Sequence, residues 1–122
     1  MPVDEFATGL ARIRQRFGDT LRSKIDENIA ALPKLSDKDA AAIETIVVVH
    51  RKLHEMCGIA PSIGFPATGN AARGAEGILR EPALAKRPLT TEELTALVAE
   101  FDSLRDAAQA DMQSSNGEES RG

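Results

Sequence analysis

The chain has 122 residues, of which 42% are hydrophobic and 3% aromatic, with neither Trp nor Tyr. Its core must therefore be built mainly from Ala, Leu, Ile and Val, which favours helices packed on helices within one domain. A formal net charge of −4 argues against a nucleic-acid-binding protein, because such proteins present a basic face. The single cysteine excludes an intramolecular disulfide and fits a reducing compartment. With no signal-peptide pattern and no apolar run of membrane-spanning length, we expect a cytoplasmic protein without membrane contact.

Residues 4–32 carry apolar side chains at helical spacing. They are Phe6, Leu10, Ile13, Phe17, Leu21, Ile25, Ile29 and Leu32. Gly18 is followed by Asp19 and Thr20, and this predicts a break or kink, because glycine weakens a helix interior and Asp or Thr can cap a new start. Pro33 should end the segment, since the residue before a proline is pushed out of helical geometry.

A second helix is predicted to begin with Ser36 as its N-cap and Asp39 three residues later. Pro61 lacks the N–H that a helix interior requires, so the helix should kink or finish around residues 57–62. Gly64 is a plausible left-handed stop, because glycine tolerates positive φ without steric cost.

The third helix is expected to begin at Pro66, where the missing N–H loses nothing. Pro82 should open the connection to the next helix. Thr90 and Glu93 have the spacing of a capping box, which predicts the start of a fourth helix.

These elements predict an all-α fold, an up-and-down four-helix bundle with an additional short N-terminal helix or a kinked first helix. The bundle should span residues 1–112. Residues 113–122 are rich in Ser, Gly and Glu and are predicted to form a disordered polar tail. We expect the bundle to be monomeric.

The second helix carries a histidine at the edge of its apolar stripe. At about 100° per residue, the stripe contains Ala42, Ile46, Val49, Leu53, Met56 and Ala60. His54 lies about 110° from the centre of the stripe and His50 about 70° from it, so His54 should meet water and His50 should lie closer to the core. Val47, Arg51 and Gly58 share the angular sector of His54.

Gly58 costs a helix about 1 kcal/mol relative to alanine, so it calls for a reason. Helix termination or close helix packing would explain it, and so would a partner that must approach the His54 ring. With Gly64-Phe65-Pro66 following, residues 46–79 resemble the phospho-acceptor region of histidine phosphotransfer (HPt) domains. In that resemblance His54 takes the phosphohistidine position, Gly58 the glycine one turn later and Ala60 the small residue after it. One bacterial branch of the family continues similarly through Asn70-Ala71-Ala72, Glu76 and Leu79.

The resemblance implies a phosphoryl carrier without autonomous kinase activity. A phosphoryl group would pass from an aspartyl phosphate on a receiver domain to the His54 ring, and from there to another receiver. The partners would be receiver domains of hybrid histidine kinases and response regulators. The receiver would bring the magnesium ion, and this chain would bind no cofactor and no metal. The residues expected to contact the receiver are Val47, Arg51, Gly58, Pro61 and Arg73.

The chain departs from the family at Cys57, where many members carry a lysine that steadies the phosphoryl oxygens. Arg51 is our first candidate for the missing positive charge, followed by Lys52 and Arg73. His50 is expected to support the acceptor. Cys57 itself is about 50° from the stripe centre, which predicts a small, buried apolar side chain rather than a reactive thiol.

Two other interpretations stay open. His50, His54 and Cys57 fall at i, i+4 and i+7 and could contribute to a zinc site, with a carboxylate such as Glu44 as the fourth ligand. Alternatively, the chain is an HPt-like adaptor that binds receivers or other proteins without carrying phosphate, or a purely structural bundle. The discriminating feature is whether His54 is exposed with Gly58 beside it.

Overall fold

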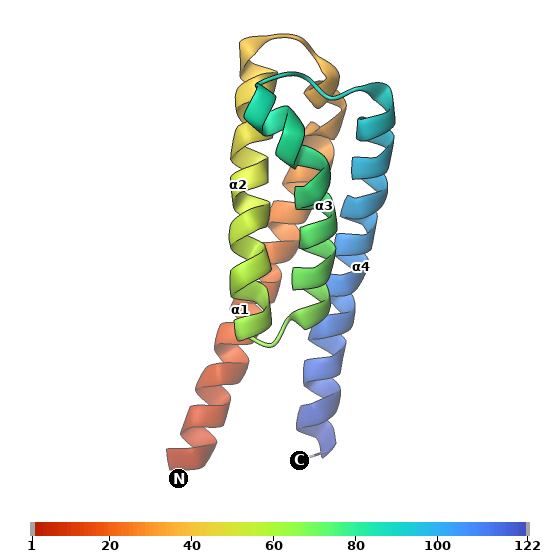
Figure 1. The fold of residues 1–122 in the computed structure, drawn as a ribbon. Coiled ribbons are helices and arrows are strands. Elements are labelled where there is room, and N and C mark those ends of the chain that lie inside the picture. The colour runs from red at the N-terminus through yellow and green to blue at the C-terminus, as the bar shows by residue number, and fades with distance from the viewer. Residues whose placement is uncertain (1, 122) are drawn as a thin grey trace.

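In the computed structural model, the backbone is described over residues 2–121 and the side chains over residues 8–113. Within this part of the chain all regular structure is helical, and the helices form an up-and-down bundle (Figure 1), which confirms the predicted fold class. The elements are α1 (Pro2–Ala31), the short 3₁₀ helix η1 (Leu32–Ser36), α2 (Ala40–Ser62), α3 (Pro66–Ala85) and α4 (Thr91–Arg121).

The bundle is organised around α3, which packs against α2 on one side and α4 on the other, while α4 also packs against α1. Every helix contributes fully or almost fully buried aliphatic side chains to one core, among them Ile25, Leu53, Leu79 and Leu97. Beyond the α2–α3 loop, α1 and α4 run on past the other two helices (Figure 1).

The predicted break at Gly18 is wrong, because α1 is continuous from Pro2 to Ala31. Gly18 instead allows a close approach of α4. A Cβ at this position would lie 2.7 Å from the sulfur of Met112. The helix does end just before Pro33, as expected, and the chain continues into η1.

The start of α2 differs from the prediction. Ser36 is the last residue of η1, and its hydroxyl donates to the carbonyl of Pro33. The N-cap is Asp39, whose carboxylate accepts a 2.8 Å hydrogen bond from the amide of Ala42. Asp39, and not Ser36, is the N-cap because its backbone is extended, which directs its side chain at the free amides of the first turn.

Pro61 lies inside the last turn of α2, which ends one residue later at Ser62. Gly64 then adopts φ of +93°, which confirms the predicted left-handed stop. As predicted, α3 begins at Pro66.

Pro82 does not open a loop, contrary to the prediction, because α3 continues through it to Ala85. Pro82 is buried, and its carbonyl accepts hydrogen bonds from the amides of Lys86 and Arg87 as the helix closes. Lys86 forms the left-handed C-cap, with φ of 53°. A proline this close to the end of a helix removes only one backbone hydrogen bond, and the burial of its ring offsets that loss.

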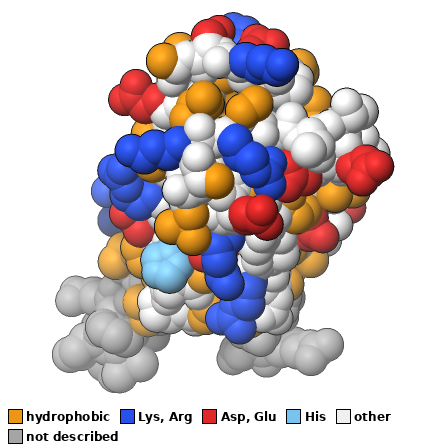
Figure 2. Space-filling model, turned by 45° about the horizontal axis from the view of Figure 1, so that its top comes forward, with side chains coloured by type: hydrophobic (Ala, Val, Ile, Leu, Met, Phe, Trp, Pro, Cys, Tyr) orange, Lys and Arg blue, Asp and Glu red, His pale blue; other side chains and the backbone are white. Residues whose placement is uncertain are grey.

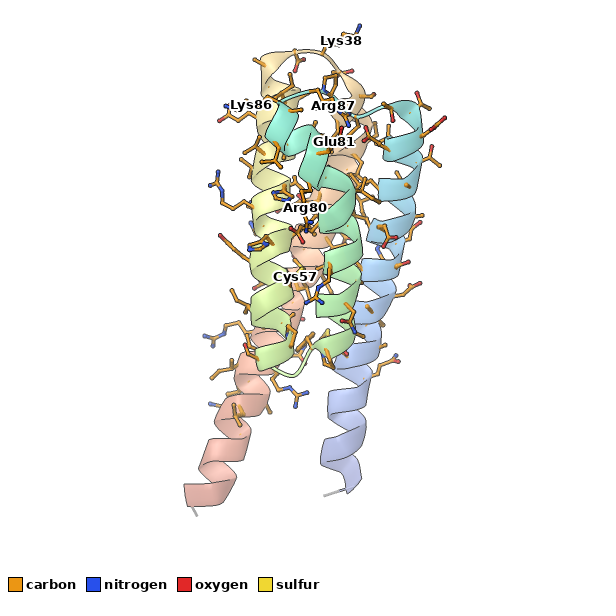
Figure 3. All side chains as sticks on the ribbon, in the orientation of Figure 1. Lys38, Cys57, Arg80, Glu81, Lys86 and Arg87 are labelled. Carbon is orange, nitrogen blue, oxygen red and sulfur yellow. The ribbon has the colours of Figure 1, made fainter. Side chains whose placement is uncertain are left out.

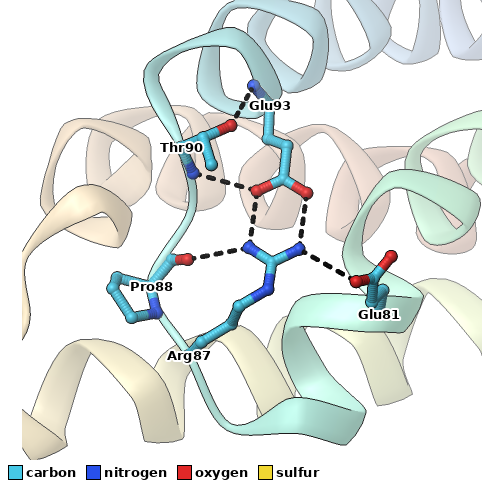
Figure 4. A network of polar contacts seen from close by, with 5 residues as sticks. All are labelled: Glu81, Arg87, Pro88, Thr90 and Glu93. Carbon is cyan, nitrogen blue, oxygen red and sulfur yellow. Dashed lines mark hydrogen bonds and ion pairs between the residues drawn. The ribbon is translucent and has the colours of Figure 1, made fainter.

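The α3–α4 connection is held by a polar network around Arg87 (Figure 4). Its guanidinium forms a bidentate pair with Glu93 at 2.8 and 2.9 Å and also donates to the carbonyl of Pro88. Glu93 completes the predicted capping box, in which it accepts from the amide of Thr90 and donates its own amide to the Thr90 hydroxyl. Arg87 is the main reason that the pKa of Glu93 falls from 4.5 to about 2.

The backbone of α4 continues as a helix past the predicted end of the bundle at residue 112, to Arg121. The side chains of residues 114–122 lie outside the described ones, and the disorder of the tail, residues 113–122, stays a prediction. Across the described part of the chain, no helix combines the length and apolarity needed to span a membrane.

Candidate functional site

His54 projects from α2 into solvent because the other side of the helix is committed to the core. Of the predicted stripe, Met56 is half-buried and the others are buried: Ala42, Ile46, Val49, Leu53 and Ala60. Their neighbour His54 keeps 73% of its side chain exposed. Figure 2 shows an imidazole at the surface of the bundle, with basic side chains close to it. The predicted boundary position of His54 therefore holds, and it is open to a partner.

A buried carboxylate from α3 lies beneath this ring. Glu76 is only 5% exposed, and its Oε1 lies 3.3 Å from Nδ1 of His54. The same oxygen lies 3.4 Å from Nε2 of His50 and 3.4 Å from a guanidinium nitrogen of Arg80. We call these four residues, Glu76, His54, His50 and Arg80, the Glu76 cluster.

Glu76 is held in its charged form. Burial, the largest influence, by itself raises the pKa of this carboxyl. Hydrogen bonds from His54 and Arg80, together with the charges of Arg80 and His50, outweigh burial and leave the pKa below its usual range. An ionised carboxylate can only accept hydrogen bonds, so the contact with His54 requires the ring proton on Nδ1.

This tautomer leaves the lone pair of the His54 ring on Nε2. Among the described side chains, no hydrogen bond engages that nitrogen. A carboxylate behind the ring also fixes its orientation, as it does for histidines that bind metals. In this tautomer the arrangement presents an oriented ring nitrogen with a lone pair, a potential nucleophile, at the protein surface.

His50 occupies the more buried position that its angle predicts, with 23% of its side chain exposed. Its Nε2 is inaccessible to solvent and, although close to Glu76, lacks the geometry of a hydrogen bond. His50 therefore supports the charge of Glu76 and is poorly placed to react with a partner itself.

The surface around His54 is open at Gly58. No atom lies within 4 Å of the position that a Cβ would take there. Helix packing therefore does not explain this glycine, in contrast to Gly69, whose Cβ would lie 2.7 Å from the ring of Pro61. Arg51 and Pro61 are exposed, and Val47 is half-buried against the core.

Cys57 is half-buried, one turn after His54 (Figure 3). Burial, followed by the charge of Glu76, raises the pKa of the thiol, although the guanidinium of Arg73 on α3 hydrogen-bonds to it and acts in the opposite direction. The thiol is therefore protonated at neutral pH, as expected for a packing residue. The structure thus brings Arg73 next to Cys57, while Arg51 makes no ion pair with the described side chains.

Glu76 and Arg80 belong to this site although neither was predicted as a site residue from the sequence. The available signal was the position of Glu76, four residues after Ala72 and three before Leu79, both of which are fully buried. An acid within such a stripe needs partners, and Arg80 at i+4 is one of them.

No group of three His, Cys, Asp or Glu side chains in the described region is arranged to hold a metal ion. In place of the zinc arrangement considered above, His50 and His54 share a carboxylate oxygen. No protein-family model matches the chain, and searches of curated proteins and of solved structures returned no match.

Proposed function

We propose that this protein is a histidine phosphotransfer protein, which relays a phosphoryl group between aspartyl-phosphate receiver domains in the cytoplasm through His54. One observation carries the proposal: a surface imidazole is held by a buried carboxylate at Nδ1 while Nε2 stays unengaged. The chain acts as a carrier and not as an enzyme, since its partners make and hydrolyse the aspartyl phosphate.

The transfer step requires only two groups of this chain, the His54 ring and the Glu76 carboxylate. The lone pair of His54 Nε2 forms the N–P bond as the P–O bond to the donor aspartate breaks, and the electron pair leaves with the donor carboxylate. The ring proton stays on Nδ1, facing Glu76, which stabilises the positive charge that the ring acquires. Magnesium, bound by the receiver, supplies charge neutralisation on the donor side.

The receiver docks on the open face around His54. Gly58 removes a side chain from that face, while Arg51 and Arg73 offer positive charge to an acidic receiver pocket. Val47 and Pro61 border the face on α2.

The test is phosphoryl uptake by the full chain, with phosphoramidate and a panel of phosphorylated receivers as donors. We expect a label that is acid-labile and alkali-stable, that disappears in His54→Gln and that persists in His50→Gln. Far-UV circular dichroism checks that both variants are folded. An unlabelled wild type, or equal labelling of His54→Gln, would refute the proposal. Receiver binding by an unlabelled wild type would favour the adaptor function instead.

A further inference from the structure

Phosphorylation of His54 would place a negatively charged group close to the ionised carboxylate of Glu76. The phosphoryl group brings up to about two negative charges at neutral pH. It would be attached to a ring that already contacts an ionised, buried carboxylate at 3.3 Å. Anions placed this close destabilise each other unless a cation is available. A phosphorylated His54 therefore needs a positive group within reach of both.

Arg80 is the cation best placed to serve. Its guanidinium and the His54 ring contact the same oxygen of Glu76, at 3.4 and 3.3 Å. The Arg80 side chain is 61% exposed, which lets its guanidinium reach the solvent side of the ring. Figure 3 shows Arg80 on α3, along the seam with α2 that also holds Cys57. We propose that Arg80 moves from Glu76 to the phosphoryl oxygens when His54 is phosphorylated. This inference rests on the proposed function.

The contact that Arg80 would give up is a loose one. Its nitrogen lies 3.4 Å from Glu76, beyond the usual range of about 2.7–2.9 Å for a charge-assisted hydrogen bond. Arg87 of the same protein is held more tightly, because it donates two hydrogen bonds to Glu93 at 2.8 and 2.9 Å. Arg80 therefore loses little when it leaves Glu76, and it gains a doubly charged, multidentate partner.

The Arg80 side chain is bordered on α3 by open space. A shallow groove of about 480 Å³ lies along α3, lined by Gly77, Arg80, Glu81, Leu84 and Ala85. A Cβ at Gly77 would meet no atom within 4 Å. After the movement, charges are matched in pairs: the phosphoryl group faces Arg80, and the protonated Nδ1 faces Glu76.

The experiment is a pH titration of the phosphohistidine signal by phosphorus NMR, on the full chain phosphorylated with phosphoramidate. A bound guanidinium favours the less protonated phosphohistidine, so we expect Arg80→Ala to raise the apparent pKa of the phosphorylated ring, observed over the neutral range where the label survives, by about one unit, a tenfold change. Arg80→Lys should restore part of the shift. Arg22→Ala removes an exposed cation on α1, beside α4, and is the matched control that should titrate as the wild type.

Repeating the titration in the Glu76→Gln variant distinguishes a direct contact between Arg80 and the phosphoryl group from an effect that acts through Glu76. If Arg80 binds the phosphoryl group, Arg80→Ala should still raise the apparent pKa of the phosphorylated ring when Glu76→Gln is present. Loss of the shift in that background, or a shift produced by Arg73→Ala and not by Arg80→Ala, would overturn the inference alone. No uptake by the wild type would overturn the proposed function, and this inference with it.

Discussion

The first turn of α3 is held by a carboxylate from α4. Asp111 accepts a 3.3 Å hydrogen bond from the amide of Ala67, and 2.7 Å bonds from both the amide and the hydroxyl of Thr68. Asp111 is 6% exposed and Thr68 is fully buried. Because the first amides of a helix have no partner within it, Asp111 acts as an N-cap supplied from another helix.

We expect Asp111→Ala to destabilise the bundle by about 2–4 kcal/mol. Losing a cap costs about 0.5–2 kcal/mol, and leaving a buried donor unsatisfied costs about 1–3 kcal/mol. The two overlap, so they do not simply add. Asp111→Asn keeps an acceptor but loses the charge, and should cost about half as much.

Urea unfolding followed by far-UV circular dichroism measures this loss, since the chain has neither Trp nor Tyr for fluorescence. Asp106→Ala is the matched control, because Asp106 is an exposed acid on the same helix. It should change the free energy of unfolding by less than about 0.5 kcal/mol. If Asp111→Ala stays within about 0.5 kcal/mol of this control, the cross-helix cap does not stabilise α3 and the argument fails.

Three further predictions concern single positions. Wild type should exceed Glu93→Gln in free energy of unfolding by a full margin above pH 4.5, and this difference should close as the pH falls towards about 2. The reason is that the lowered pKa of Glu93 makes its stabilisation depend on its ionised form. A difference that stays constant with pH in urea titrations would contradict this. Gly64→Ala should cost about 1 kcal/mol or more in the same assay, because φ is +93° there; an unchanged midpoint would refute it. Gly58→Leu should fold normally and accept a phosphoryl group from phosphoramidate at the wild-type rate, because the position is open. Uptake from a receiver should be at least tenfold slower, because the leucine obstructs docking. Equal slowing with both donors would exclude a role for Gly58 in docking.

The sequence predicts those features that a single helix encodes. The stripe on α2 has a fixed period, so the exposure of His54 follows from residue spacing alone. The capping box at Thr90 and the left-handed Gly64 are equally local. Where local signals were ambiguous, tertiary contacts decided the outcome: Met112 on α4 occupies the space at Gly18, so that glycine serves packing and not a break.

The partners of His54 could not be predicted in the same way. Spacing along α3 places Glu76 and Arg80 on one face, but it does not say which residue of α2 they meet. That register depends on how far α3 slides along α2. It is set by the Gly64 turn, by the close contact between Gly69 and Pro61, and by the cap from α4.

Among the side chains that the structure describes, two carboxylates are buried, Asp111 and Glu76, and their contacts differ in kind. Asp111 accepts hydrogen bonds from backbone amides and from the buried hydroxyl of Thr68, two of them at 2.7 Å. Glu76 is equally buried, yet its contacts with His54, His50 and Arg80 are all 3.3–3.4 Å and come from side chains. Short bonds to backbone hold one geometry, whereas longer contacts with side chains allow partners to be exchanged at small cost. A carboxylate serving only stability would gain from the first arrangement. Glu76 has the second, which suits a ring whose charge changes whenever a phosphoryl group arrives or leaves.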